Sequence, residues 1–333
     1  MDRAGDRAVE AWAALTAACV RTDRRGGLEL LDGPRGRRAP VWPYGQALAA
    51  AVDLDRLDGD HGGSERWVDG LTAFARGDAY VPAPRHRRRY FDDNAWIGLA
   101  LAQRHRREGR TADLVHARRV FDVVRTGADP DGGVRWVEGR RSRNACATAP
   151  AAQLALQLHL EDGDEATAAF ARRSMAWLDR TLMLTSGLVA DHEDEGRVDA
   201  TVWSYNQGST AGAWALLYRI AAEPDALEHA GRVANASLGR FRDHVLWSHP
   251  PIFNAIWFRN LLALHALRPV SGLLEHVDGY LERVWNEARD PRTGLFTAGG
   301  IGSYDGTPAI DHAGLTQLFA LRAWPREAWI DIA

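Results

Sequence analysis

Two adjacent aspartates, Asp92 and Asp93, are the side chains of this sequence best suited to acid–base chemistry. They stand at the start of a helix-like run that continues through Asn94 and Trp96. Two neighbouring carboxyl groups repel each other when both are ionised, so their apparent pKa values separate. One group then serves as a carboxylate and the other as an acid. Hydrolysis of a glycosidic bond uses such a pair.

A structural role also accounts for one of the two aspartates. A carboxylate at the start of a helix accepts hydrogen bonds from the free N–H groups of the first turn, and the helix dipole favours negative charge there. This role explains a single aspartate well and an adjacent pair less well. The positions alone leave the catalytic and the capping interpretations open.

The elements that must position this pair are helices, because helical spacing of apolar residues recurs twelve times and strand-like alternation is rare. The predicted helices span residues 7–20, 43–57, 65–76, 93–107, 111–126, 146–160, 164–182, 207–222, 226–244, 254–267, 271–288 and 311–323. Loops after the fourth, sixth, eighth and tenth helices are short, whereas those after odd-numbered helices are mostly long. In an up-and-down array the long loops all fall at one end, and long loops in a compact domain are usually functional.

The even-numbered helices are apolar nearly all round and rich in small residues, which is typical of buried helices. The odd-numbered helices are amphipathic, as helices with one face in solvent are. This alternation predicts an all-α fold: an (α/α)6 barrel of six helical hairpins, forming a single domain over residues 1–333. Each inner helix then begins at the long-loop end, so its N-terminus faces the expected site.

Polar and aromatic residues gather at five of these inner-helix starts, and less strongly at the sixth, as expected where a ligand pocket forms. Besides the aspartates, the candidate ligand contacts are Asn94, Trp96, Trp136, Asn144, Tyr205, Asn206, Gln207, Phe253 and Arg259.

Several candidates have a structural alternative. Trp96 could pack in the core, and the amides of Asn144, Asn206 and Gln207 could cap helices or satisfy loop backbone. A buried arginine is costly without a partner, so Arg259 is expected to pair with Asp311 or with the aspartate pair.

Two charged runs are interpreted first as solvated loops. The acidic run covers residues 191–195, and the basic run covers residues 85–89 directly before the aspartates. The functional alternative for the basic run is contact with an anionic group of the substrate, such as a phosphate. Cys146 is expected to be a small buried residue.

Composition excludes several classes of protein. The chain has 333 residues and a net charge of −3, which does not favour nucleic-acid binding. No apolar stretch reaches the roughly 18–20 residues of a membrane span. Two cysteines and scattered histidines predict neither a disulfide framework nor a metal site, and no cofactor is expected. The N-terminal run is a poor signal peptide, so a cytoplasmic location is expected.

Five stretches taken together resemble glycoside hydrolase family 76, the endo-α-1,6-mannanases. They are RYFDDNAWIGLAL (89–101), GGVRW (132–136), RNACATAPAAQLAL (143–156), WSYNQGSTAGAWALLY (203–218) and FNAIWFRNLLAL (253–264). The resemblance implies an (α/α)6 barrel and retaining hydrolysis of α-1,6-linked mannose polymers. It further implies that Asp92 is the nucleophile and Asp93 the general acid/base. The expected partner is a mannose-containing oligosaccharide, polysaccharide or glycolipid.

Other functions fit the same architecture. Isoprenoid synthases need a third acidic residue in the aspartate motif, and this sequence lacks it. Sugar epimerases use catalytic histidines, and no pair of histidines stands at the inner-helix starts. A non-catalytic carbohydrate-binding protein, or a glycosidase for another α-linked sugar, remains open.

Overall fold

The computed structural model describes residues 3–23, 26–57, 61–297 and 308–332. Its α-helices are α1 (Arg3–Cys19), α2 (Val41–Leu54), α3 (Ser64–Gly70), α4 (Phe91–Glu108), α5 (Thr111–Val124), α6 (Ala145–Asp162), α7 (Glu165–Leu182), α8 (Ser204–Ala221), α9 (Pro224–Arg240), α10 (Asp243–Trp247), α11 (Pro251–Leu267), α12 (Leu273–Glu287) and α13 (Pro308–Ala323). The strands are β1 (Val20–Thr22), β2 (Leu28–Leu30), β3 (Ala75–Arg76), β4 (Ala79–Tyr80), β5 (Arg143–Asn144), β6 (His192–Asp194) and β7 (Arg197–Asp199).

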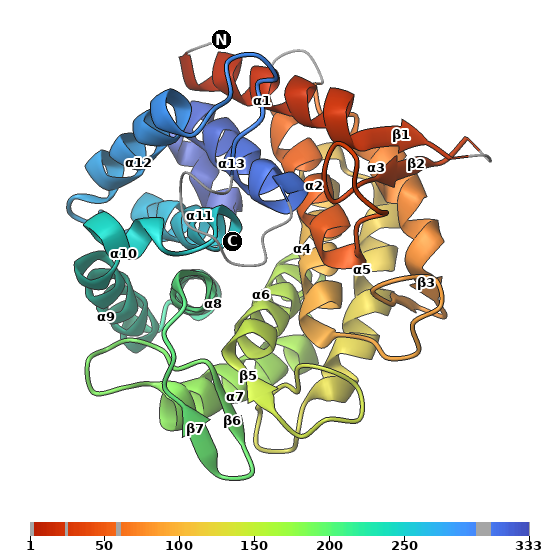
Figure 1. Cartoon of the computed structure of the whole chain (residues 1–333). Coiled ribbons are helices and arrows are strands. Elements are labelled where there is room, and N and C mark those ends of the chain that lie inside the picture. Colours follow the sequence, from red (N-terminus) through yellow and green to blue (C-terminus); the bar gives the residue numbers. More distant parts are fainter. Residues whose placement is uncertain (1–2, 24–25, 58–60, 298–307, 333) are drawn as a thin grey trace.

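Six helices form a closed inner ring in which each one contacts the next. The order around the ring is α2, α4, α6, α8, α11 and α13, and α13 contacts α2 to close it (Figure 1). An outer helix lies against each: α3, α5, α7, α9 and α12 against the first five, and α1 against α13. The arrangement is an (α/α)6 barrel, which confirms the predicted all-α fold.

Residue size explains why the inner helices approach each other so closely. In α8, a side-chain Cβ on Gly208 would lie 2.4 Å from the Cα atom of Trp257 in α11. Any larger residue there would push the two helices apart. Alanines occupy much of the remaining contact surface, so α6 is buried all the way from Ala145 to Leu158. The outer helix α12 buries only one face, as its amphipathic sequence predicts.

All twelve predicted helices are present, with two local differences. The predicted helix 65–76 ends at Gly70 and continues as a 3-10 turn, Leu71–Phe74. The predicted helix 226–244 ends at Arg240, and the separate short helix α10 covers its last two residues and extends into the segment expected to be loop. Among the described residues, none of the helices has the length and apolar character needed to cross a membrane.

The acidic run 191–195 is more ordered than a solvated loop. Its middle part, His192–Asp194, forms β6, which pairs with β5 on one side and β7 on the other. Glu193 is buried, and one of its oxygens lies 2.6 Å from Nη2 of Arg143. Only Asp194 and Glu195 are exposed as predicted. Strand pairing and this ion pair therefore correct the interpretation for the start of the run.

Candidate active site

The N-termini of the inner helices meet at one end of the barrel, and apolar side chains there form a cluster separate from the main core. Its buried members are Ile252, Phe253, Ile256 and Ile310, and the partly buried residues packed on it are Trp42, Trp96, Trp203 and Tyr205. The rings of Tyr205 and Phe253 stack with centroids 4.0 Å apart. The aromatic members of this cluster form an aromatic wall at the mouth of the barrel, contributed by α2, α4, the start of α8 and α11.

Asp92 lies in the first turn of α4, partly exposed at this mouth, and its carboxylate is held by three donors. Oδ1 accepts a hydrogen bond of 2.9 Å from the backbone N–H of Asp93. Oδ2 accepts one of 2.9 Å from Nε1 of Trp136 and a longer one of 3.7 Å from Sγ of Cys146. Both side-chain donors come from outside α4, so the orientation of Asp92 depends on tertiary structure.

Trp136 is itself fixed on several sides. Its backbone carbonyl accepts from the N–H of Phe91, and its own N–H donates to Ser142. The ring of Tyr90 meets the indole edge-on at 5.0 Å. The preceding turn packs against α7 so tightly that a Cβ on Gly133 would lie 2.5 Å from the ring of Trp177. The indole N–H is therefore directed at Asp92 by backbone pairing, although the side chain is 41% exposed.

Asp93 has a different environment from its neighbour. Within the described part of the chain, no group donates a hydrogen bond to its carboxyl oxygens, and no cationic side chain forms an ion pair with either aspartate. Burial raises the pKa of Asp93 well above its ordinary value, and the charge of Asp92 raises it further. Burial also raises the pKa of Asp92, to about 6, while the hydrogen bonds from Asp93, Trp136 and Cys146 act in the opposite sense.

These two environments separate the protonation states of the pair. Hydrogen bonds to the ionised form favour the carboxylate of Asp92, and its place at the helix N-terminus adds to this. Desolvation beside a negative neighbour favours the protonated form of Asp93. Near neutral pH the site therefore presents one carboxylate and one carboxylic acid. This is the division of roles that a pair of catalytic carboxyl groups requires.

Comparison with known proteins identifies the family. The family model described as glycosyl hydrolase family 76 matches residues 27–267. The chain belongs to glycosyl hydrolase family 76. It is therefore a glycoside hydrolase, as the motifs around the aspartates indicated. No curated protein matches the chain.

Solved structures of family 76 share this fold. The mannosidase Bt3792 from Bacteroides thetaiotaomicron VPI-5482 is 21% identical with a TM-score of 0.86, covering 97% of this chain and 98% of that one. A family 76 hydrolase from a bovine Bacteroides thetaiotaomicron strain is 24% identical with a TM-score of 0.84, covering 97% and 78%. An inactive α-1,6-mannanase variant from Salegentibacter sp. HEL1_6, with two consecutive aspartates replaced by alanine and α-1,6-mannotetrose bound, is 19% identical with a TM-score of 0.79, covering 96% and 99%.

Two side chains that were predicted to contact the sugar, Asn94 and Gln207, instead bind the backbone of this family 76 hydrolase. Asn94 is fully buried, and its amide accepts from the N–H of Tyr80 at 2.8 Å and donates to the carbonyl oxygen of Tyr80 at 3.0 Å. Gln207 is equally buried and exchanges the same pair of bonds with Val189. Each amide ties a loop to an inner-helix start. The prediction that they contact a sugar is corrected, because their polar atoms are already used.

The other two amides, Asn144 and Asn206, bond to side chains. Asn144 is nearly buried before α6, and its oxygen accepts from the hydroxyl of Ser142 at 2.6 Å. Asn206 is buried and donates to Oδ1 of Asp191 at 3.1 Å. A third carboxylate, Asp191, is thereby placed at the same end of the barrel. Asn206 thus acts on the site by holding Asp191 rather than by facing the opening.

The aromatic candidates divide by exposure. Trp96 and Tyr205 are partly exposed and Trp136 is exposed, and their contact with a sugar stays a prediction. Phe253 is 5% exposed and lies behind Tyr205, within 6.2 Å of the ring of Trp42. Its role is to support the rings in front of it, which corrects its prediction as a direct contact.

Arg259 lies deeper in the barrel than predicted and binds neither Asp311 nor the aspartate pair. Its guanidinium lies 2.5 Å from Oδ2 of Asp53, which is fully buried in α2. It also donates to the side-chain oxygens of Gln103 and Gln317. This network joins α2, α4, α11 and α13 inside the ring. Because Asp53, Gln103 and Gln317 engage both Nη atoms of the guanidinium inside the ring, the prediction that Arg259 contacts substrate is corrected.

Two site residues escaped the sequence-based selection. Cys146 was expected to be inert packing, yet its thiol bonds to Asp92, and its position at an inner-helix start was the available signal. Asp191 was assigned to the solvated acidic run, although it closes a long loop just before the start of β6. Its proximity to α6 follows from strand pairing, which the sequence does not reveal.

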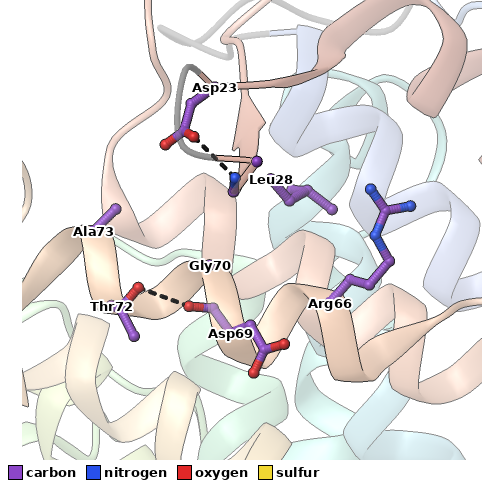
Figure 2. A pocket seen from close by; sticks show the side chains of 9 residues that line it. Asp23, Leu28, Arg66, Asp69, Gly70, Thr72 and Ala73 are labelled. Carbon is purple, nitrogen blue, oxygen red and sulfur yellow. Dashed lines mark hydrogen bonds between the residues drawn. The ribbon is translucent and has the colours of Figure 1, made fainter.

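Two other features lie apart from this chemistry. Among the described residues, no group of three or more His, Cys, Asp or Glu side chains has the geometry to hold a metal ion. A surface pocket lies between the β1–β2 turn and α3, lined by residues that include Asp23, Arg66 and Asp69 (Figure 2). Asp23 there accepts a hydrogen bond from the backbone of Gly27 at 2.9 Å. No inner-helix start contributes to that pocket.

Proposed function

We propose that this protein hydrolyses α-1,6-mannosidic linkages with retention of anomeric configuration, using Asp92 and Asp93. The observation that carries the proposal is the unequal pair itself. One carboxylate is held by Trp136 and Cys146, and its neighbour is desolvated with no donor. The Salegentibacter α-1,6-mannanase supports the proposal, because its variant without two consecutive aspartates is inactive and holds α-1,6-mannotetrose.

In the first step the carboxylate of Asp92 attacks the anomeric carbon of a mannose residue. The glycosidic bond breaks, its electron pair goes to the leaving oxygen, and Asp93 gives that oxygen its proton. The products are a free sugar hydroxyl and a glycosyl ester on Asp92. The raised pKa of Asp93 keeps this proton available near neutral pH.

In the second step Asp93, now ionised, takes a proton from water. The water oxygen attacks the anomeric carbon, and the ester bond to Asp92 breaks. Asp92 leaves as a carboxylate, Asp93 is again protonated, and two inversions give net retention. Hydrogen bonds from Trp136 and Cys146 stabilise the charge that returns to Asp92.

The aromatic wall suits the proposed substrate. Trp96, Trp136 and Tyr205 offer ring surface near the pair, and sugar rings have apolar faces that pack on such surfaces. Asp191, held by Asn206, offers oxygens that accept hydrogen bonds from sugar hydroxyls. The substrate class is a mannose-containing oligosaccharide, polysaccharide or glycolipid.

The test is hydrolysis of α-1,6-linked mannotriose and mannotetraose beside their α-1,2 and α-1,3 isomers. Proton NMR in the first minutes identifies the anomer formed before mutarotation. We expect cleavage of the α-1,6 chains, with the α-anomer appearing first. First appearance of the β-anomer would contradict the double-displacement scheme.

Two variants complete the test. Asp92→Asn and Asp93→Asn preserve side-chain shape and are each expected to abolish cleavage. Binding of the tetraose by calorimetry without cleavage by the unmodified protein would instead establish a carbohydrate-binding protein. Cleavage confined to another isomer would establish a different linkage specificity.

A further inference from the structure

We propose that the basic loop directly before the aspartates binds an anionic, phosphate-type group carried by the mannoside. This inference rests on the proposed function and deepens it by naming a charged substrate class. The basic loop is defined as residues 85–89, and its distinctive members are Arg85, Arg87 and Arg88.

The basic loop is held in place by its own contacts. Arg89 lies 2.7 Å from Oε1 of Glu138 and donates to the backbone oxygen of Arg76. Arg76 in turn donates to the backbone carbonyls of His86 and Arg87. The backbone N–H of Glu138 donates to the carbonyl of Arg89 at 3.0 Å, which joins the loop to the segment that carries Trp136.

These contacts leave three guanidinium groups without a counter-charge. Arg85, Arg87 and Arg88 are exposed, and no carboxylate of the described chain lies within the 4.0 Å of an ion pair. Most other arginines at this end of the barrel are paired, as Arg135 is with Asp129 and Arg143 with Glu193. An ordered loop that uses one arginine as an anchor and leaves three free is suited to binding an external anion.

The basic loop lies close to the reacting groups. Only Arg89, Tyr90 and Phe91 separate Arg88 from Asp92, so their Cα atoms are at most about 14 Å apart. His86 and Tyr90 have ring centroids 6.1 Å apart, and Tyr90 in turn meets Trp136, the donor to Asp92. A substrate bound along these rings carries any nearby substituent toward the guanidinium groups.

Charge and geometry favour a phosphate group over other ligands. Arginine binds phosphate oxygens with two parallel hydrogen bonds, and the pairing is strengthened by opposite charge. The carboxylate of Asp92 and that of Asp191 repel an anion from the neighbouring part of the mouth. The phosphate group is therefore expected at the α4 side, where the basic loop lies.

The test compares binding of α-1,6-mannotriose with that of the same trisaccharide as its glycosyl methyl phosphate. Calorimetry uses the Asp92→Asn/Asp93→Asn protein, so that neither ligand is consumed. The loop variant is Arg85→Gln/Arg87→Gln/Arg88→Gln. The matched control, Arg173→Gln/Arg180→Gln/Arg232→Gln, removes the same charge from exposed positions of α7 and α9.

We expect the phosphorylated ligand to bind about tenfold more tightly at low salt, with the preference shrinking as salt rises. The loop variant should bring the ratio of the two dissociation constants to about one, and the control should keep it. Equal binding of both ligands, binding of neither, or a preference that survives in the loop variant would overturn the inference. Absence of hydrolysis by the unmodified protein would overturn the proposed function separately.

A further arm identifies the source of the phosphate. A mannotriosyl phospholipid is presented in phosphatidylcholine vesicles beside the soluble methyl phosphate. With the preference for the methyl phosphate present, equal affinity for the vesicles indicates that a phosphorylated glycan is a sufficient ligand, and a higher affinity for the vesicles indicates a lipid headgroup. Preference for neither overturns the inference.

Discussion

Asp53 and the Asp92–Asp93 pair are acidic side chains of the same inner ring, and they differ in what surrounds them. Asp53 is fully buried and receives hydrogen bonds from Arg259 and Gln103. Burial raises the pKa of Asp53, and the guanidinium of Arg259 acts against that rise. The pair at the mouth has two carboxyl groups and, among the described residues, no cation.

The difference shows how one fold separates stability from chemistry. Where a carboxylate ties helices together, the chain supplies an arginine and a glutamine, Arg259 and Gln103, that donate hydrogen bonds to it. At the mouth, the chain supplies neutral donors to Asp92 and none to Asp93, so one proton is retained in the site. A matched cation there would stabilise both carboxylates and remove the acid that the proposed reaction needs.

The largest expected effect is the loss of activity when either aspartate of the pair is replaced. Asp92→Asn and Asp93→Asn should each lower kcat/KM on an α-1,6-mannoside by roughly 10³–10⁴-fold, because each removes one of the two reacting groups. Unfolding in urea should show stability unchanged or raised by up to about 1 kcal/mol. Asp92→Asn removes a desolvated charge that has no cation, and Asp93→Asn removes a carboxyl group that must take up a proton on folding.

A purely structural role of Asp92 and Asp93 would contradict this contrast between the two regions. A loss of stability of about 2 kcal/mol or more in either variant would mean that the pair holds the helix start rather than performs chemistry. Retained activity in both variants would have the same meaning.

Removing the buried guanidinium of Arg259 should instead lower the stability of the protein. Arg259→Leu leaves Asp53 buried and unpaired, and we expect the free energy of unfolding to fall by about 3–5 kcal/mol. The measurement is urea unfolding at pH 7. Arg283→Gln serves as control, because Arg283 pairs with Glu287 on an exposed helix face, where loss costs about 0–1 kcal/mol. Equal, small effects of both changes would contradict a structural role for the buried network.

A smaller effect is expected on the pH dependence of activity, which Asp92 controls at low pH. Activity should fall as pH drops through about 6, because the nucleophile then becomes protonated. Trp136→Phe removes a hydrogen bond to the ionised form, so the pKa of Asp92 rises. The acid limb of kcat/KM should move up by about 0.5–1 pH unit. Trp214→Phe, on α8 away from the mouth, should leave the limb in place, and an unmoved limb in Trp136→Phe would show that the indole does not tune Asp92.

The smallest expected effect concerns Cys146. Its thiol is a weak donor at 3.7 Å, so Cys146→Ala should move the acid limb in the same direction by less than Trp136→Phe does. Cys146→Ser offers a stronger donor and should move the limb the other way. The pH profile of kcat/KM measures both. The same shift in both variants would indicate a packing effect instead.

The sequence predicted the fold well because helical periodicity and residue size act locally. The alternation between small, apolar helices such as 146–160 and amphipathic helices such as 271–288 distinguishes the inner from the outer ring. The barrel of six helical hairpins was predicted from the alternation of short and long loops. Short strands such as β6 were missed because they depend on pairing with distant segments.

The site was predicted in outline and missed in detail. Asp92 and Asp93 lie at an inner-helix start, as the sequence predicted, and Trp136 lies in the long loop that follows α5. Which polar side chain faces the opening depends on tertiary hydrogen bonds, and these direct Asn94 and Gln207 to loop backbone. The pairing of Arg259 with Asp53 joins residues 206 positions apart, and sequence spacing carries no signal for it.

The most direct measurement is the titration of the aspartate carboxyl carbons by ¹³C NMR in the unmodified protein. Asp92→Asn and Asp93→Asn assign the two mouth signals. We expect Asp92 to titrate near pH 6 and Asp93 to remain protonated well above the ordinary range of an aspartate. Titration of both carboxyl groups near the ordinary value of about 4 would contradict it, because neither would then carry the proton that the proposed reaction requires.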